Sequence, residues 1–370
     1  MKVSEFDFDL PEELIAQDAV PRGESRLLVV NRSTGQLDHG VVRDLPSYFR
    51  QGDLLVANDT RVFPARLLGH RQPSGGAVEC LLLSREADGT WSALMHPGQK
   101  LKPGALVRFP HASGTLMAEV LERQFFGRRR IRLWAEDGGA EDRGTEDGDV
   151  DALVDAMGHV PLPPYIHRDD TPEDRERYQT VFAAHRGSIA APTAGLHFDA
   201  ALLDAIDRAG VERVTITLHV GYGTFKPVRA GDVEDHVVDP EPYEISSGAA
   251  DAINRALDAG RRVIAVGTTT TRALEDAARK GGARVRAGEG RAEIFIHPPF
   301  DFLVISGLLT NFHLPKSSLL MLVSAFAGRP STGSGRPELV EGRELILHAY
   351  REAVSRRYRF YSYGDAMLVV

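Results

Sequence analysis

The sequence predicts an α/β protein whose main domain carries a small inserted β-barrel, and three observations lead to this fold class. With 370 residues the chain exceeds one ordinary domain, so two domains are expected. Residues 64–135 hold short apolar stretches separated by glycine-containing turns, a pattern typical of a small barrel. The rest of the chain alternates helix and strand signals, which is α/β order. We therefore expect a main domain formed by residues 1–63 and 156–370, with residues 64–155 as the inserted barrel domain.

Five strands are expected in the barrel segment, because it contains five apolar stretches of strand length. They are VECLLL, TWSALMHP, ALVRFP, TLMAEVLER and RRIRLW. Dipeptides ending in glycine mark the turns, for example Asp88-Gly89 and Pro103-Gly104. Cys80 lies in the first of these strands, where a small buried hydrophobic residue is expected and not a nucleophile.

A strongly acidic stretch ends the barrel segment. Residues 136–155 contain nine acidic residues and one arginine, so they account for the net charge of −8. The stretch is rich in glycine and shows no apolar periodicity, so we expect a flexible, solvated loop at about residues 136–150. A second flexible linker is expected at residues 328–337, GRPSTGSGRP.

Two basic clusters are interleaved with aromatic residues. The first has five arginines at residues 123–132 around Phe125 and Phe126, and the second has four at residues 351–359 around Tyr358 and Phe360. Cations bind phosphates and aromatic rings stack on unpaired bases, so either cluster could contact RNA. Solvated faces joined by salt bridges would give the same pattern.

In the main domain, apolar spacing predicts alternating helices and strands. A helix capped by Asp199 precedes a strand at residues 214–220, and a helix at about residues 247–257 precedes the buried strand VIAVG. A very apolar helix, LLMLVSAFAG, follows Ser317, which is a good N-cap.

His219 belongs to the polar face of the strand at residues 214–220. Since Ile216 and Leu218 share the apolar face, Thr217 and His219 share the other one. His219 lies at the carboxyl end of this strand, where open α/β sheets bind ligands. A titrating imidazole is useful there, although a core histidine bonded to the backbone fits the pattern equally well.

Four consecutive threonines, Thr268–Thr271, link the strand VIAVG to a helix. Amide N–H groups and hydroxyls at a helix start can hold an anion, such as a phosphate or a carboxylate, and Arg272 adds a bidentate fork. Ordinary capping by Thr270 or Thr271 is the simpler explanation, but one cap does not require four threonines. Thr268, Thr269 and Arg272, with Glu275 in the same helix, are candidates for substrate binding.

Other candidate site residues lie at helix starts and turns. The loop NFHLPKS carries His313 and Lys316 directly into the apolar helix, and helix capping explains neither of them. His197 in TAGLHF lies near another helix start, where the pKa of an imidazole is lowered and a neutral base is favoured.

Asp59 and Arg61 in NDTRV adjoin the domain boundary, where they would contact substrate or pair with each other. Asp365 in YSYGDAML precedes a strand, where a turn aspartate is common.

Composition and missing motifs exclude several classes. The chain is 42% hydrophobic and 26% charged, and no apolar run reaches the length of a signal peptide or a membrane span, so we expect a cytoplasmic protein without membrane contact. A single cysteine excludes an internal disulfide and the iron–sulfur cluster that radical chemistry uses. The glycine loop of dinucleotide-binding proteins, the P-loop, the G-x-S-x-G elbow and the H-E-x-x-H zinc motif are absent, so metal-free chemistry is expected.

Several longer segments occur in a fixed order along the chain. They are GDLLVANDTRVFPARL, DRERYQTVF, GSIAAPTAGLHF, TLHVGYGTFKPV, VGTTTTRALE, NFHLPKS and RYRFYSYGDAML. Together they closely resemble the S-adenosylmethionine:tRNA ribosyltransferase-isomerase family of queuosine biosynthesis. The resemblance covers nearly the whole chain and thins out at about residues 85–155, 281–292 and 329–342. The family has serine and valine where this chain has Thr270 and Thr271, and a hydroxyl is kept at the first of these positions.

The resemblance implies an α/β sandwich-like main domain with an inserted barrel, and a reaction that consumes S-adenosylmethionine as a co-substrate, with no cofactor and no metal. The ribosyl moiety is transferred to 7-aminomethyl-7-deazaguanine in the wobble position of a tRNA and isomerised, giving epoxyqueuosine-tRNA, adenine and methionine. The protein is expected to be a monomer. Such chemistry needs proton transfers, for which His219, His197 and His313 are the candidates. The candidates for substrate binding are Thr268, Thr269, Arg272, Glu275, Lys316, Asp59, Arg61 and Asp365.

Two other classes of function stay open from the residues alone. One is a methyltransferase-like or sugar-phosphate enzyme, and the other is a non-catalytic RNA-binding module that uses the barrel. Release of free adenine and methionine from S-adenosylmethionine in the presence of tRNA would distinguish the three.

Overall fold

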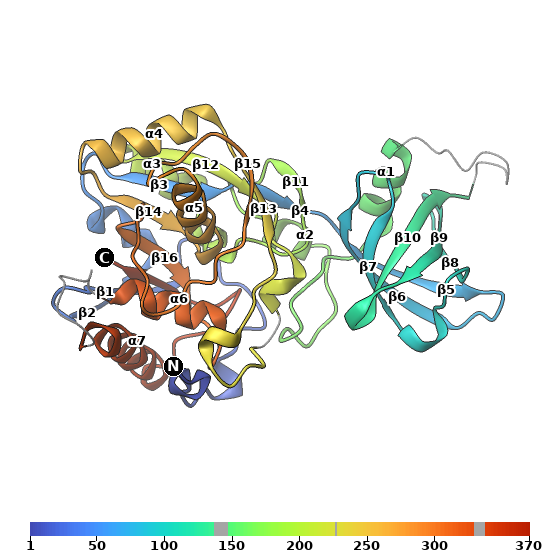
Figure 1. Ribbon diagram of the computed structural model, residues 1–370, viewed down its shortest axis with the longest axis horizontal. Helices are drawn as coiled ribbons and strands as arrows, with labels where there is room; N and C mark the ends of the chain where they lie inside the picture. Colours follow the sequence, from blue (N-terminus) through green and yellow to red (C-terminus); the bar gives the residue numbers. More distant parts are fainter. Residues whose placement is uncertain (137–146, 226–227, 329–336) are drawn as a thin grey trace.

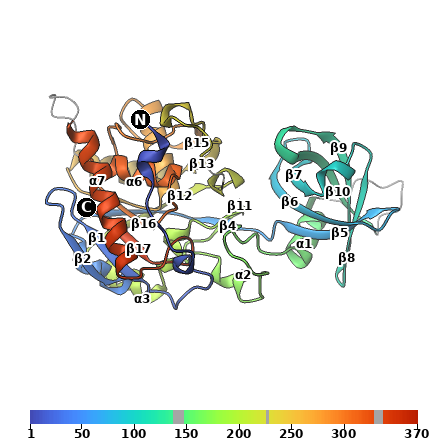
Figure 2. The same ribbon diagram turned by 90° about the horizontal axis from the view of Figure 1, so that it is seen from below.

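The protein folds into a large α/β domain, which holds both chain ends, and a β-barrel that lies beside it (Figure 1). The computed structural model describes residues 1–136, 147–225, 228–328 and 337–370. Figure 2 shows from a second direction that the barrel stands apart from the α/β domain along the long axis of the molecule. The expected fold class is confirmed.

The α/β domain is built on a mixed sheet that, in the described residues, has nine strands in the order β15-β13-β12-β3-β14-β16-β17-β1-β2. At its centre β12, β3, β14 and β16 run parallel, so their carboxyl ends lie along one edge. The strands are β1 (Arg26–Val30), β2 (Leu37–Val41), β3 (Leu54–Asn58), β12 (Glu212–Leu218), β13 (Glu241–Ile245), β14 (Val263–Val266), β15 (Gly288–Ala292), β16 (Gly307–Asn311) and β17 (Ala366–Val369).

Helices cover both faces of this sheet, which makes the domain a sandwich. Strand residues alternate between the faces: Val56 and Ile216 pack with α4 to α7, whereas Leu55 and Leu309 pack with α3 and the 3-10 helix Val42–Tyr48. The helices are α2 (Asp174–Arg177), α3 (Ala200–Arg208), α4 (Ser247–Asp258), α5 (Thr268–Lys280), α6 (Ser318–Ala327) and α7 (Pro337–Ser355).

The expected helix starts at Asp199 and Ser317 are confirmed. The carboxylate of Asp199 accepts a hydrogen bond from the backbone N–H of Leu202, and the hydroxyl of Ser317 accepts one from Leu320. Each cap satisfies one of the N–H groups that the first helical turn leaves without a partner.

The barrel is closed, in the order β10-β7-β6-β5-β8-β9. Its strands are β5 (Arg66–Gln72), β6 (Ala77–Arg85), β7 (Trp91–His96), β8 (Leu106–His111), β9 (Gly114–Arg123) and β10 (Arg128–Ala135). Strand β5 was not predicted, because Gly69 interrupts its apolar pattern. A Cβ atom at Gly69 would lie 2.5 Å from the carbonyl oxygen of Arg108, so the close approach of β8 requires glycine there. Cys80 is fully buried in the barrel, and burial raises the pKa of its thiol.

A helix follows the acidic stretch. Residues Asp147–Met157 form α1, and Val150 and Val154 are buried against the barrel. The expected loop is therefore wrong for residues 147–150, because two valines at helical spacing are enough to anchor one helix face. Residues 137–146 of the expected loop and 329–336 of the expected linker lie outside the described residues.

The two basic clusters differ in the exposure of their aromatic rings. Tyr358 and Phe360 are completely buried, so the second cluster cannot stack bases on these rings. In the first cluster Arg129 is buried and donates to the carbonyl oxygens of Gly98 and Leu101, while the ring of Phe125 is 86% exposed. Within the described residues, no helix is both long and apolar enough to cross a membrane.

Candidate active site

The carboxyl ends of the four parallel strands gather most of the expected site residues at one edge. His219 follows β12, Asp59 follows β3, Thr268 follows β14 by one residue, and His313 follows β16. The chain leaves β3 through the short strand β4 (Thr60–Val62), paired with β11 (His185–Ser188), and enters the barrel from there. The barrel is therefore connected to the α/β domain at the edge where α/β sheets commonly bind ligands.

A small pocket lies where α5 begins, and we call it the α5 pocket. Its volume is about 50 Å³, and its lining includes Thr268, Thr269, Asn311, His313 and Tyr361. Three of the sequence candidates therefore lie together. Asn311 and Tyr361 belong to the segments NFHLPKS and RYRFYSYGDAML, and neither was a predicted site residue. An amide at the end of an apolar strand is a signal that could have identified Asn311.

The four threonines divide into two pairs. The hydroxyl of Thr270 donates to the carbonyl of Val266 at 2.7 Å, and that of Thr271 donates to the carbonyl of Gly267 at 3.2 Å. Gly267 is the N-cap residue with φ of 94°, and no side chain caps the helix, so the alternative explanation, capping by Thr270 or Thr271, does not apply. Within the described residues, no hydrogen bond engages the hydroxyls of Thr268 and Thr269. The first helical turn, which lines the pocket, thus keeps two free hydroxyls and free N–H groups within the described residues.

Asn311 is held by His197 and Tyr361. Its amide nitrogen lies 3.1 Å from Nε2 of His197 and donates to the carbonyl of Tyr361 at 3.1 Å. Nε2 of His197 accepts, so Nδ1 carries the proton and donates to the hydroxyl of Ser25 at 3.0 Å. Burial lowers the pKa of His197 to about 4, so its ring is neutral at physiological pH.

His313 lines the same pocket as a buried, neutral ring. Nε2 is 3.0 Å from the hydroxyl of Thr310, and the backbone N–H of His313 donates to the hydroxyl of Tyr350 at 3.0 Å. Burial lowers its pKa to about 3. His313 is thus suited to hydrogen bonding in its neutral form.

His219 and Asp59 form a separate group at the same sheet edge. Nδ1 of His219 lies 2.8 Å from the hydroxyl of Thr60, and Thr217 donates to the carboxylate of Asp59 at 2.6 Å. His219 lines a different cavity, of about 410 Å³, together with residues of β13 and β15 such as Glu289. Burial lowers its pKa as well. The structure therefore does not bring the three histidines around one cavity.

The charges of Arg272 and Glu275 are used inside the protein. Arg272 donates to the carboxylate of Glu241 at 2.8 Å and to the backbone carbonyls of Asp239, Ala292 and Ile294. The fully buried carboxylate of Glu275 accepts from the backbone N–H groups at residues 303–305. Both side chains fix loops around α5.

The remaining candidates lie further from the α5 pocket. The buried carboxylate of Asp365 accepts from the backbone N–H groups of Arg26 and Arg359. Lys316 forms an exposed ion pair with Asp7 at 2.7 Å, and Arg61 is exposed beside a cavity of about 290 Å³. Among the described residues no ion pair joins Arg61 to Asp59.

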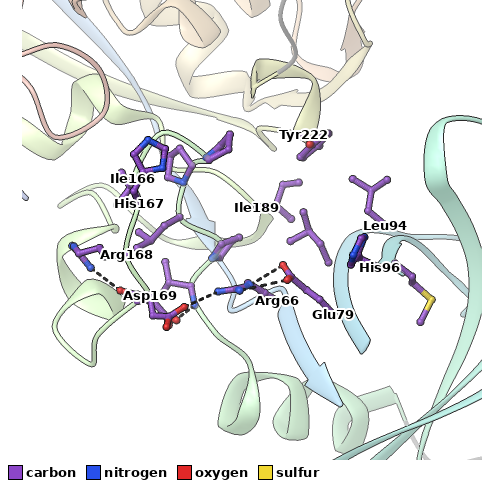
Figure 3. Close-up of a pocket in the computed structure, with 18 of the residues that line it drawn as sticks. Arg66, Glu79, Leu94, His96, Ile166, His167, Arg168, Asp169, Ile189 and Tyr222 are labelled. Atoms are coloured by element: carbon purple, nitrogen blue, oxygen red, sulfur yellow. Dashed lines mark hydrogen bonds and ion pairs between the residues drawn. The ribbon is translucent and has the colours of Figure 1, made fainter. Parts of the chain in front are cut away.

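A larger cavity, which we call the interdomain cavity, lies between the barrel and the α/β domain (Figure 3). It has a volume of about 670 Å³, within the range of small-molecule sites. Arg66 of β5 bridges the carboxylates of Glu79 at 2.8 Å and Asp169 at 3.7 Å, so it links the two domains. Tyr222 lines it from the α/β domain.

None of the candidate site residues predicted from the sequence lines the interdomain cavity. Glu79 and His96, which do, come from a stretch without any motif, so the sequence held no signal for them. Among the described residues, no group of three or more His, Cys, Asp or Glu side chains is placed to share a metal ion.

Comparisons with known proteins cover the whole chain. The family model described as "Queuosine biosynthesis protein" matches residues 3–369. The chain is 49% identical to the S-adenosylmethionine:tRNA ribosyltransferase-isomerase of Symbiobacterium thermophilum, and 47% identical to that of Heliobacterium modesticaldum, with 100% of both chains covered in each case. A crystal structure of S-adenosylmethionine tRNA ribosyltransferase from Thermotoga maritima is 34% identical, with a TM-score of 0.52, over 99% of this chain and 100% of that one. This chain belongs to the queuosine biosynthesis protein family.

Proposed function

We propose that the protein transfers the ribosyl moiety of S-adenosylmethionine to 7-aminomethyl-7-deazaguanine in the wobble position of tRNA and isomerises it. The products are epoxyqueuosine-tRNA, adenine and methionine. Relatives that match over their full length carry the name of this enzyme, and the residues above supply polar groups that such a reaction needs.

The observation that carries the proposal is the sheet edge at which four parallel strands end and the inserted barrel begins. It offers a small pocket at the start of α5 and a cavity of about 670 Å³ between the domains. The larger cavity has room for an extruded nucleotide, and an anticodon base must leave its stack to enter such a site.

Proton transfers are assigned to histidines that are neutral at physiological pH. The sulfonium acidifies the neighbouring C5′–H, so a neutral imidazole can act as the base that forms an ylide. His219 is the least buried of the three candidates and opens onto a cavity, so we assign it one of the proton transfers. His313 binds substrate through its neutral ring, and His197 acts through Asn311.

Substrate binding is divided between direct and indirect contacts. Thr268 and Thr269 contact the co-substrate directly, because both residues line the α5 pocket and their hydroxyls are free within the described residues. Arg272, Glu275 and Asp365 hold the surrounding backbone, and Asp59 holds Thr217 beside His219. Arg61 and Lys316 are exposed, and we assign them contacts with tRNA phosphates. We further propose that the enzyme acts as a cytoplasmic monomer without a metal or a resident cofactor.

The proposal is tested by following two isotopic labels. S-adenosylmethionine labelled in its ribose, or in its methyl group, is incubated with tRNA that carries 7-aminomethyl-7-deazaguanine. Label from the ribose should enter the tRNA and label from the methyl group should stay with free methionine. Incorporation of the methyl label would instead support a methyltransferase, and binding without incorporation of either label would support an RNA-binding module. A tRNA with guanine in the wobble position is the matched control.

A further inference from the structure

Asn311 carries a buried acceptor that the protein does not use. Oδ1 of Asn311 is buried and has no hydrogen-bond partner among the described residues, and the residue is only 2% exposed. Leaving a buried carbonyl-type oxygen without a donor is costly, so such groups in folded proteins usually have a reason.

The orientation of this amide is fixed by its neighbours. The carbonyl oxygen of Tyr361 can only accept, so the side of the amide that faces it must be the nitrogen. The same nitrogen faces Nε2 of His197. A rotated amide would place two acceptors against each other, so Oδ1 cannot gain a partner by flipping. A group that enters the α5 pocket, which Asn311 lines, can supply the missing donor.

The start of α5, which also lines the pocket, is suited to a carboxylate. Helix α5 starts there with no side-chain cap, and the hydroxyls of Thr268 and Thr269 are free within the described residues. Free N–H groups and the positive end of the helix dipole favour an anion at this position.

The pocket carries no full charge of its own. Its lining, as far as the structure describes it, contains no Asp, Glu, Lys or Arg. A phosphate dianion would find no counter-charge there, whereas a zwitterionic group is neutral overall and would find an acceptor on one side and donors on the other. A volume of about 50 Å³ fits a few non-hydrogen atoms and is too small for a nucleoside.

We propose that the α5 pocket binds the α-amino-acid end of S-adenosylmethionine, with Oδ1 of Asn311 accepting from the α-ammonium group. Thr268 and Thr269 donate to the α-carboxylate. Asn311 is then a binding residue for the co-substrate. His197 is a positioning residue that holds the amide of Asn311 in its orientation. The inference deepens the proposed function and rests on it.

The test pairs changes in the protein with changes in the ligand. Calorimetric titration measures binding to wild-type protein, Asn311→Ala and Thr269→Val, with tRNA carrying guanine in the wobble position present so that no turnover occurs. The ligands are S-adenosylmethionine, its analogue without the α-amino group, its decarboxylated analogue, and the inosine analogue that lacks the adenine amino group.

Asn311→Ala should weaken binding of S-adenosylmethionine by roughly ten- to a hundredfold, the range of a hydrogen bond to a charged group. The same substitution should leave binding of the analogue without the α-amino group unchanged. Likewise, Thr269→Val should weaken binding of the intact ligand but not of the decarboxylated one. The matched control is Asn254→Ala, which removes an amide paired in both directions with the backbone of Val285, away from the pocket, and should not change affinity.

If Asn311→Ala weakened binding of the analogue without the α-amino group as much as binding of S-adenosylmethionine, the proposal would be overturned. If the loss of affinity vanished only with the inosine analogue, Asn311 would contact adenine instead. Should Asn311→Ala fail to fold, the Thr269→Val arm decides alone: an equal loss for intact and decarboxylated ligands would contradict the carboxylate site. Each of these results leaves the proposed function standing. Wild-type protein that binds no S-adenosylmethionine would contradict the proposed function and this inference with it.

Discussion

Thr268 and Thr269 differ from the two threonines that follow them in what their hydroxyls do. Thr270 and Thr271 donate back into their own helix, and the first two face a pocket. The sequence predicted a hydroxyl-rich helix start. It could not predict this division, because the division depends on which side of the helix faces the sheet edge.

The sequence predicted well which side chains are buried and which are polar. It predicted less well which groups those side chains contact. The spacing of apolar residues around His219 placed it on the correct strand face, since alternation determines the face directly. Arg272 has the form of an anion fork, yet four of its contacts are internal. Those contacts come from segments 20 to 33 positions away, beyond the reach of a local pattern.

The role of His219 can be tested by removing its titratable ring. His219→Gln should lower turnover by about 10² to 10⁴-fold, the usual contribution of a general acid or base. The thermal midpoint should move little, because the ring is only partly buried and, within the described residues, Thr60 is the side chain that hydrogen-bonds it. Steady-state kinetics and thermal unfolding of the same preparation measure both. A large loss of stability with near-normal turnover would show that His219 is a core residue.

His197 should make stability depend on pH. Burial lowers its folded-state pKa to about 4, below the value of about 6.5 in the unfolded chain, so the unfolded state binds the proton more tightly. Stability contributed by the neutral ring is therefore complete above pH 6.5. It falls as the pH drops towards 4, by at most about 1.4 kcal/mol per unit. Urea unfolding at pH 7.5 and 5.0 should show a smaller loss for His197→Gln than for the wild type. Equal losses would contradict a neutral buried imidazole.

At the scale of elements, α5 is tied to the loop that precedes β16. The carboxylate of Glu275 accepts three backbone N–H groups from residues 303–305. Glu275→Ala leaves these buried donors without a partner and should cost about 3 kcal/mol of stability. Glu275→Gln keeps one acceptor oxygen and should cost less. Urea unfolding measures the difference, and Glu275→Ala protein with wild-type stability would contradict this structural role.

Helix α1 shows where sequence reasoning about an element failed. Nine acidic residues dominate the stretch at residues 136–155, and this composition predicts a solvated loop. Its two buried valines are the weaker signal, although they anchor the helix. A single anchored face is enough for a helix that packs against an existing barrel, because tertiary contacts supply most helical stability.

The packing of α1 can be tested at its most buried position. Val154 is fully buried against the barrel, so Val154→Ala should destabilise the protein by about 2 kcal/mol. The exposed residue Asp149 provides the matched control, and Asp149→Ala should change stability by less than about 0.5 kcal/mol. Chemical unfolding of both variants measures this. If the two losses were equal, the helix would not be docked as described.

At the scale of the whole molecule, the barrel and the α/β domain meet at the edge that carries the site. The order of elements predicted two kinds of domain, because glycine turns and α/β alternation are local signals. Which strands are neighbours could not be predicted: β3 lies between β12 and β14, more than 150 residues away in sequence. Only this pairing brings Asp59, His219 and Thr268 to one edge.

The most direct test of the whole account is the stoichiometry of the released products. Wild-type protein is incubated with S-adenosylmethionine and tRNA that carries 7-aminomethyl-7-deazaguanine, and free adenine, methionine and S-adenosylhomocysteine are quantified by chromatography. The account predicts adenine and methionine in equal amounts, matched by the gain of one ribose-derived unit per modified tRNA. Formation of S-adenosylhomocysteine in place of adenine and methionine would contradict it.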